Sequence, residues 1–284
     1  MKLKFHLGHN STLSQLELDS VLGKGNQIKD FNHLNHVCNR LGGLVKVTDQ
    51  KGKTLWIHSA KSWYRRDRLK PYSDPKKGML PPKLARIMVN LALGQKGPTL
   101  KDVPNPEGGG SDLFENLTLL DPFCGTGTIL IEAGILGLNT IGADLDSKQL
   151  AGTKTNLNWA RTKNFKLINS DATHISDKLE EKVDYIVTEP FMGAPNPRPE
   201  KIKNIVTGLK KLYLGCLKDW AKIMNPGGII VITLPYFQSE GKTLKTSSII
   251  DSLIALSYNV KTKDINFTRP GSAVQREIIV LEKK

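Results

Sequence analysis

The sequence has few cysteines and no long apolar run. Its 284 residues include only three cysteines, Cys38, Cys124 and Cys216, which lie far apart and show neither metal-site nor disulfide spacing. A reducing, cytoplasmic location is therefore expected, and no metal site is predicted. No apolar stretch approaches the roughly 20 residues of a membrane-spanning helix, so no membrane association is predicted. The N-terminus also lacks the apolar segment and cleavage site of a signal peptide.

Acidic residues are scarce in the first third of the chain. Residues 1–90 contain 17 Lys and Arg against 6 Asp and Glu, a balance of +11. The remaining residues contain 24 against 21, a balance of +3. Because most of the net charge of +14 lies in one region, a polyanion-binding surface is predicted there. The alternative is a well-solvated basic surface that has no such partner.

The pattern of elements predicts two parts. Residues 1–70 combine leucines at helical spacing with two short strands around a turn, which indicates a small, basic α/β domain. The basic stretch 61–78 that follows these strands has three aromatics and two prolines, and is interpreted as a linker or exposed loop. Residues 71–284 alternate strands with helices, as in a doubly wound, mainly parallel sheet, here of seven strands. Within this part, residues 95–116 are rich in Gly and Pro and are predicted to form a flexible loop.

A glycine loop in the stretch LLDPFCGTGTIL is the most informative local feature. An apolar strand ends at Asp121, and the loop leads into an apolar helix. Gly125 and Gly127 permit a tight turn and close approach of the backbone to a ligand. Only two glycines of the dinucleotide fingerprint are present, and the Gly-Lys-Ser/Thr end of a P-loop is absent. The acid at the end of the strand therefore favours a cationic or amine-bearing ligand over a pyrophosphate.

Two further acids end the next two predicted strands. Asp144 lies 23 residues after Asp121, where an acid can bind both hydroxyls of a ribose. Asp171 ends the third strand, where it can accept a hydrogen bond from an adenine amino group. Together the three acids and the glycine loop predict a nucleoside with an ammonium or sulfonium group, which describes S-adenosylmethionine. Each acid taken alone can equally be a helix cap or a turn former.

The stretch DPFCGTGTILIEA resembles motif I of class I S-adenosyl-L-methionine-dependent methyltransferases. It is most similar to RNA guanine-N2 methyltransferases in which a small THUMP domain accompanies the catalytic domain. KGMLPPKLARIMVNLA resembles the helix before motif I, and QREIIVL the closing strand, so that the resemblance covers residues 60–284. It implies a Rossmann-like class I methyltransferase fold with a small α/β N-terminal domain. It also implies three sets of cofactor contacts. The ribose would be bound by Asp144 with Leu145, and the adenine by Asp171 with Ala172. The methionine part would be bound by Asp121, Phe123, Cys124, Gly125, Thr126, Gly127 and Thr128.

The fourth strand ends in Thr188-Glu189-Pro190-Phe191, where the family has Asp/Asn-Pro-Pro-Tyr/Phe. In that motif a side chain and a backbone carbonyl accept hydrogen bonds from the amine of a flipped base, and a ring stacks on the base. One alignment places Glu189 in the acid position and Met192 in the ring position, and the other places Thr188 and Phe191 there. Glu189 is preferred as acceptor and general base with Phe191 stacking, because a threonine cannot accept a proton. The alternative is a strand-ending turn with a solvated glutamate.

The substrate implied by the resemblance is guanine N2 in structured RNA, and tRNA in particular. Four basic residues in KSWYRRDRLK are predicted to contact phosphates: Arg65, Arg66, Arg68 and Lys70. Trp63 and Tyr64 beside them serve either as stacking partners or as packing residues. The N-terminal region is short for this family, so a trimmed RNA-binding domain or an accessory protein subunit is expected. A DNA amino-methyltransferase acting on adenine N6 or cytosine N4, and a catalytically silent RNA-binding homologue, are the alternatives.

Overall fold

The computed structural model describes most of the chain as two compact units. The described residues are 3–23, 28, 30–75, 79–96, 114, 116–194, 196–239, 242–250, 252, 257–267 and 274–284. The first unit comprises Met1–Leu117, Thr126–Thr140 and Gly152–Phe165, and the second Thr118–Gly125, Ile141–Ala151 and Lys166–Lys284. The loop predicted at 95–116 lies largely outside the described residues. The boundary predicted at residue 70 stays a prediction.

The first unit contains a small antiparallel sheet in the order β1-β2-β3. Its strands are β1 (Lys4–Leu7), β2 (Leu44–Thr48) and β3 (Thr54–Ile57). Helices α1 (Ser11–Leu22) and α2 (Phe31–Arg40) supply apolar side chains to the cluster that also includes Leu44 and Val47 of β2. The predicted α/β character of this region is confirmed.

The basic stretch after β3 is a helix, so the prediction of a linker was wrong for residues 61–68. Helix α3 (Ala60–Arg68) begins after Ser59, whose side chain accepts a hydrogen bond from the Ser62 backbone N–H. Three arginines lie in its last turn, where positive charge interacts favourably with the helix dipole. The unit also contains α4 (Pro82–Lys96), α5 (Thr128–Ile135) and the end of α6 (Ser147–Trp159).

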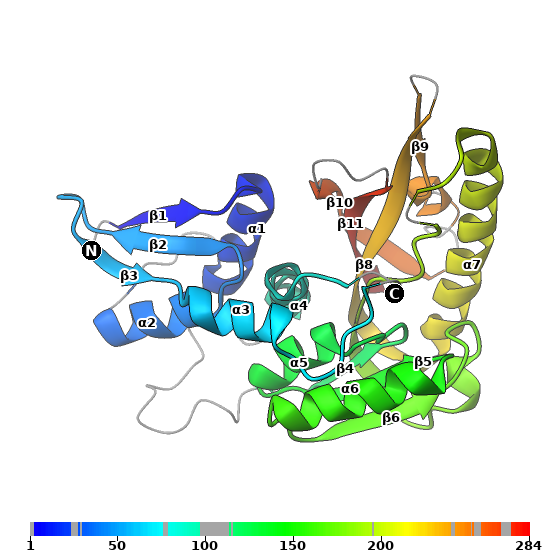
Figure 1. The fold of residues 1–284 in the computed structure, drawn as a ribbon, viewed down its shortest axis with the longest axis horizontal. Helices are drawn as coiled ribbons and strands as arrows, with labels where there is room; N and C mark the ends of the chain where they lie inside the picture. Colours follow the sequence, from blue (N-terminus) through cyan, green and yellow to red (C-terminus); the bar gives the residue numbers. More distant parts are fainter. Residues whose placement is uncertain are drawn as a thin grey trace. The chain divides into compact units, whose positions relative to one another are not determined.

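The large sheet has the strand order β10-β11-β8-β7-β4-β5-β6. Strand β9 pairs with β8 (Figure 1). The strands are β4 (Thr118–Asp121), β5 (Asn139–Asp144), β6 (Phe165–Asn169), β7 (Val183–Thr188), β8 (Met224–Ser239), β9 (Lys242–Lys245), β10 (Tyr258–Phe267) and β11 (Val274–Lys283). All seven predicted strands are present, and β9 is an addition. Because β5 and β7 lie on opposite sides of β4, the strand order reverses there. Such a switch point is where ligands bind in open α/β sheets.

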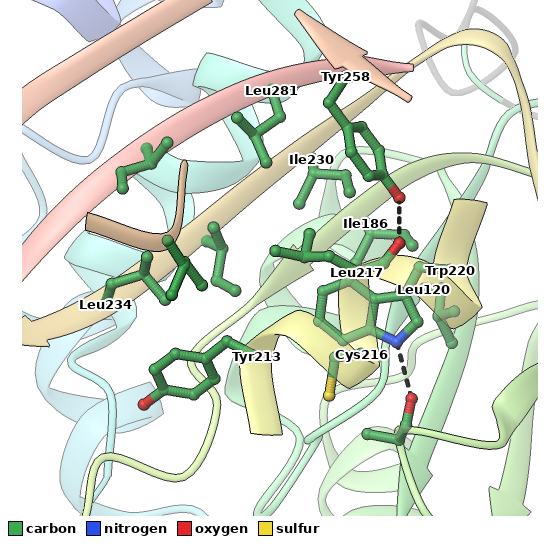
Figure 2. Packing of buried hydrophobic residues seen from close by; sticks show 14 of the residues in the cluster. Leu120, Ile186, Tyr213, Cys216, Leu217, Trp220, Ile230, Leu234, Tyr258 and Leu281 are labelled. Carbon is green, nitrogen blue, oxygen red and sulfur yellow. Dashed lines mark hydrogen bonds between the residues drawn. The ribbon is translucent and has the colours of Figure 1, made fainter. Parts of the chain in front are cut away.

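Helix α7 (Ile202–Ile223) contributes much of the core of the second unit, as its apolar stripe predicted. Trp220 and Tyr213 of this helix are fully buried. The Tyr258 hydroxyl donates to the Leu217 carbonyl at 2.7 Å, and the Trp220 indole donates to the Ala172 carbonyl at 2.9 Å (Figure 2). Burying each large apolar side chain contributes about 1.5–3 kcal/mol, so this core anchors the strand ends described below. No described helix is both long enough and apolar enough to cross a membrane.

Candidate active site

Asp121 and Thr188 meet at the switch point between β4 and β7. These strands are parallel, with Leu119 opposite Tyr185 and Leu120 opposite Ile186. The Thr188 hydroxyl donates to Asp121 Oδ1 at 2.7 Å, and the Phe123 backbone N–H donates to the same oxygen at 3.2 Å. Burial of Asp121 outweighs these hydrogen bonds and raises its pKa to about 7. A positive group beside this carboxylate would therefore stabilise its ionised form.

Asp144 at the end of β5 holds the glycine loop within the second unit. Its Oδ2 accepts from the Gly125 backbone N–H at 3.0 Å, and its Oδ1 accepts from the Asp146 backbone N–H at 2.9 Å. The Cys124 N–H donates to the Ala143 carbonyl at 2.9 Å. Since each carboxylate oxygen has two lone pairs, Asp144 can still accept from ligand hydroxyls. Leu145 follows it and is 73% exposed, so an apolar side chain is accessible at this strand end.

The next three residues of the loop lie in the first unit and are held by Lys70. The Lys70 ammonium donates to the hydroxyls of Thr126 at 2.9 Å and Thr128 at 3.0 Å. Lys70 is buried, and burial lowers its pKa to about 8. Gly127 between the threonines has a φ of +79°, and a Cβ there would lie 2.9 Å from Thr153 Cγ2. Only glycine satisfies both conditions, so the loop predicted from the sequence requires this residue.

Asn169, at the end of β6, was not predicted as a site residue. Its side-chain amide donates to the backbone carbonyls of Asp144 and Leu145 at 2.9 Å each, which ties the ends of β5 and β6 together. Asp171 is exposed, and its Oδ1 accepts from the backbone and the hydroxyl of Thr173 at 2.8 Å. These hydrogen bonds lower the Asp171 pKa, while Oδ2 is available to a ligand. Ala172 is buried, and its carbonyl accepts a hydrogen bond from the Trp220 indole in the core.

The corner Glu189-Pro190-Phe191 follows β7 and presents two different chemical groups. Glu189 forms a two-pronged ion pair with Arg276 of β11: Nε lies 2.9 Å from Oε2, and Nη2 lies 2.8 Å from Oε1. Phe191 is 61% exposed, whereas Met192 packs against the core. Thr188 is fully buried, and its hydroxyl donates a hydrogen bond to Asp121. Glu189 and Phe191, one from each alignment, are therefore the candidates for contact with a substrate.

The four predicted phosphate contacts differ in their surroundings. Arg65 and Arg68 are exposed. Arg66 bonds through Nε to the buried Glu132 at 2.6 Å and stacks on the Trp63 ring at 4.1 Å. Lys70 is buried at the glycine loop, as described above. The packing alternative for Trp63 is thus the one that the structure favours, because Lys83 and Arg86 also lie over its ring.

Comparisons with known proteins identify sequences similar to this chain. Residues 110–245 match a family described as RMKL-like, methyltransferase domain. The chain is 35% identical over 188 residues to a tRNA (guanine(10)-N2)-dimethyltransferase of Methanothermobacter thermautotrophicus, covering 66% of this chain and 45% of that protein. It is 36% identical to a probable enzyme of the same name from Methanothermococcus thermolithotrophicus, covering 45% of this chain and 70% of that sequence. The chain spans less than half the length of the first three curated relatives: the matches cover 45%, 38% and 40% of those proteins.

A solved structure shows the same fold. The crystal structure of TrmN from Thermus thermophilus matches with a TM-score of 0.53 and 20% sequence identity. The match covers 85% of this chain and 56% of that one. The predicted Rossmann-like fold of class I methyltransferases is therefore confirmed.

Proposed function

Because the chain belongs to the family of the tRNA guanine-N2 methyltransferases described above and its residues 110–245 match an RMKL-like methyltransferase domain, we propose that it methylates the N2 amine of a guanine in tRNA. The methyl donor of this family is S-adenosylmethionine. The observation that carries the proposal is the hydrogen bond from the Thr188 hydroxyl to Asp121 at the switch point. Thr188 is followed directly by Glu189, so this bond connects Asp121 to the corner that begins there. This arrangement supports a cofactor-binding role for Asp121 and a substrate-acceptor role for Glu189 at the neighbouring strand end.

The donor set at the strand ends fits this cofactor. The buried Asp121 carboxylate, with its pKa raised to about 7, suits the ammonium group of the methionine part. Asp144 has free lone pairs for the ribose hydroxyls, and the exposed Leu145 provides an apolar surface for the adenine. Asp171 offers Oδ2 to the adenine amino group. When bound, the cofactor supplies a sulfonium-activated methyl carbon.

The corner residues handle the substrate. Phe191 is exposed and can stack on a base that has left its helix. Glu189 accepts a hydrogen bond from the exocyclic amine, which orients the nitrogen lone pair. The nitrogen must lose a proton once it has gained a fourth substituent, and the Glu189 carboxylate is the acceptor at hand. Pro190 restricts the backbone between these two side chains.

The exposed basic residues of α3 are the proposed RNA contacts. Arg65 and Arg68 are exposed; Arg65 lies over the Trp159 ring and Arg68 pairs with Asp67, and such exposed contacts are weak enough to yield to phosphates. Tyr64 is 58% exposed beside them. Arg66 and Lys70, also predicted from the sequence, would have to leave their internal partners in order to do so. An accessory subunit that adds RNA-binding surface, and a cytoplasmic location, remain part of this proposal. The three free cysteines fit such a location.

The test is methyl transfer from tritiated S-adenosylmethionine to tRNA, ribosomal RNA and duplex DNA, followed by mass spectrometry of the nucleosides. Label in N2-methylguanosine or N2,N2-dimethylguanosine from tRNA is the expected result. Label in N6-methyl-2′-deoxyadenosine or N4-methyl-2′-deoxycytidine from DNA would establish the DNA alternative instead. Cofactor binding without transfer to any nucleic acid would identify a silent homologue.

A further inference from the structure

Two side chains outside the motif contact the Glu189–Phe191 corner at its polar groups. Arg276 of β11 holds the Glu189 carboxylate, and Tyr213 of α7 donates its hydroxyl to the Phe191 carbonyl at 2.7 Å. We propose that Arg276 and Tyr213 are positioning residues of the methyl-transfer reaction, which fix the acceptor carboxylate and the backbone of the corner. The role in catalysis rests on the proposed function, whereas the clamp itself does not.

Arg276 compensates for the length of Glu189. A glutamate has one more rotatable bond than the aspartate or asparagine of the family pattern, so its carboxylate alone would sample more positions. Arg276 removes this freedom because its planar fork binds both oxygens at once, at 2.9 and 2.8 Å. Each oxygen uses one lone pair for Arg276 and keeps another for a substrate amine. The acceptor is thus oriented before substrate arrives.

The ion pair is not explained by stability alone. The side chains of Arg276 and Glu189 are only 17% and 16% exposed, so both charges have lost most of their water. Burial lowers the pKa of Arg276, but the hydrogen bonds and charge of Glu189 outweigh this effect and raise it overall. Removing two charges from water costs about as much as their attraction returns. Orienting the carboxylate is therefore the better account of why this pair lies here.

Tyr213 acts at the other end of the corner. Its side chain is fully buried, and burial raises its pKa, so the hydroxyl stays neutral and can donate. The hydrogen bond to the Phe191 carbonyl fixes the orientation of that peptide group, while the Phe191 ring stays 61% exposed. Tyr213 thus holds the backbone still and leaves the stacking surface accessible. It also leaves one lone pair of the carbonyl for a substrate amine.

Matched variants separate positioning from general stability. Tyr213→Phe and Tyr258→Phe each delete one hydroxyl that donates to a backbone carbonyl at 2.7 Å in the same core, but only Tyr213 contacts the corner. Arg276→Met removes the fork, and Arg276→Lys keeps the charge without it. Lys261→Met is the ion-pair control, since Lys261 pairs with Glu282 of the same strand as Arg276.

The first readout is amide hydrogen exchange of the peptide that contains Glu189, Phe191 and Met192, which requires neither cofactor nor RNA. Tyr213→Phe and Arg276→Met should speed exchange there, whereas Tyr258→Phe and Lys261→Met should leave it unchanged. Equal exchange in all four variants and the wild type would overturn the clamp, whatever the enzyme methylates. Absence of methyl transfer by the wild type would instead overturn the proposed function and leave the exchange result standing.

The second readout is steady-state kinetics with tRNA. Arg276→Met should lower kcat on the order of 10²-fold, the cost of a misplacement of about 1 Å, with Arg276→Lys intermediate. Tyr213→Phe should lower kcat about tenfold, and affinity for S-adenosylhomocysteine should stay within about twofold of wild type in every variant. A kcat loss equal to that of Tyr258→Phe, or a gain on Arg276→Met, would overturn the positioning role. A gain would show that the ion pair restrains the enzyme.

Discussion

Thr188 donates its hydroxyl hydrogen to Asp121 at 2.7 Å, across the point where the strand order of the large sheet reverses. The two residues end parallel neighbours, β4 and β7, and both are buried. The family pattern puts an acid or amide at the end of the fourth strand. A threonine at position 188 instead donates to the acid at position 121, and Glu189, one residue further on, is the proposed acidic group of the motif.

Asp121 should make cofactor affinity depend on pH. Its pKa of about 7 in the folded protein means that it is largely protonated below this value, whereas an ammonium ligand requires the ionised form. Affinity for S-adenosylhomocysteine should therefore fall about tenfold for each pH unit below about 7 and level off above it. Asp121→Asn keeps an Oδ1 acceptor for Thr188 and Phe123, and should bind weakly with a flat profile between about pH 5.5 and 7. Identical profiles in titration calorimetry would contradict this assignment.

The same group has an opposite signature in the free protein. A carboxyl whose pKa is raised by folding contributes stability below its unfolded value of 3.8, and this contribution is lost as pH rises to about 7. The free energy of unfolding of the wild type, relative to Asp121→Asn, should therefore decrease over that window. Denaturant unfolding of both proteins without ligand measures the difference and serves as the control for the affinity experiment.

Asp144→Ala should weaken cofactor binding about 10- to 100-fold, because hydrogen bonds to charged groups contribute about 1.5–3 kcal/mol. The substitution removes the acceptor for the Gly125 and Asp146 backbone groups as well as for the ribose. Glu181→Ala is a suitable control, since Glu181 forms an exposed pair with Lys166. Equal affinity of Asp144→Ala and the control would remove the ribose assignment.

The sequence revealed the parts of the site that are local in the chain. Asp121, Gly125 and Asp144 lie where a strand runs into a loop, and that transition is visible in the pattern of apolar residues and glycines. Arg276 was missed because its partner lies 87 residues away and it stands in an otherwise ordinary strand. Lys70, 56 residues from Thr126, resembled any exposed lysine of a basic stretch.

Helix α3 was missed for a related reason. It has little apolar content, so periodicity gave no helical signal in this stretch. Its stabilising contacts come from distant residues: Glu132 binds Arg66, and Trp159 lies 5.3 Å from the Arg65 guanidinium. Tertiary contacts of this kind override local propensity.

Glu189→Gln should reduce turnover on the order of 10²–10⁴-fold, the usual contribution of an acid–base group. The variant keeps the size of the side chain but loses its charge and its capacity to take a proton. Cofactor affinity should stay near that of the wild type, because Asp121 and Asp144 are untouched. Glu200→Gln, at an exposed position, is the control for a charge change. Full activity of Glu189→Gln would mean that the carboxylate is not the proton acceptor.

Phe191→Ala should impair use of RNA without affecting folding. The ring is 61% exposed, so little burial is lost, while stacking on a base contributes about 1–3 kcal/mol. A 5- to 100-fold lower kcat/KM, that is, roughly 1–3 kcal/mol, is expected, with recovery in Phe191→Trp. Phe31→Ala, at a 53% exposed position in the first unit, is the control. A large loss of thermal stability in Phe191→Ala would show that the ring packs instead.

The basic residues of α3 should separate into two groups. The double variant Arg65→Ala/Arg68→Ala should weaken tRNA binding and flatten its salt dependence by up to about two units of slope, while lowering the melting temperature less than Arg66→Ala does. Arg66→Ala should destabilise the protein by about 1–3 kcal/mol, because it removes one of the two arginines that pair with the fully buried Glu132. Filter binding at several salt concentrations and thermal unfolding distinguish the groups. A melting temperature lowered equally in both variants would argue against this division.

A crystal structure with sinefungin, in which an amine replaces the transferable methyl group, tests the central claim most directly. The ligand should lie across the ends of β4, β5 and β6, with its ammonium at Asp121, its ribose at Asp144 and its extra amine facing the Glu189–Phe191 corner. Density elsewhere on the protein, or a ligand whose extra amine points away from Glu189, would contradict the account.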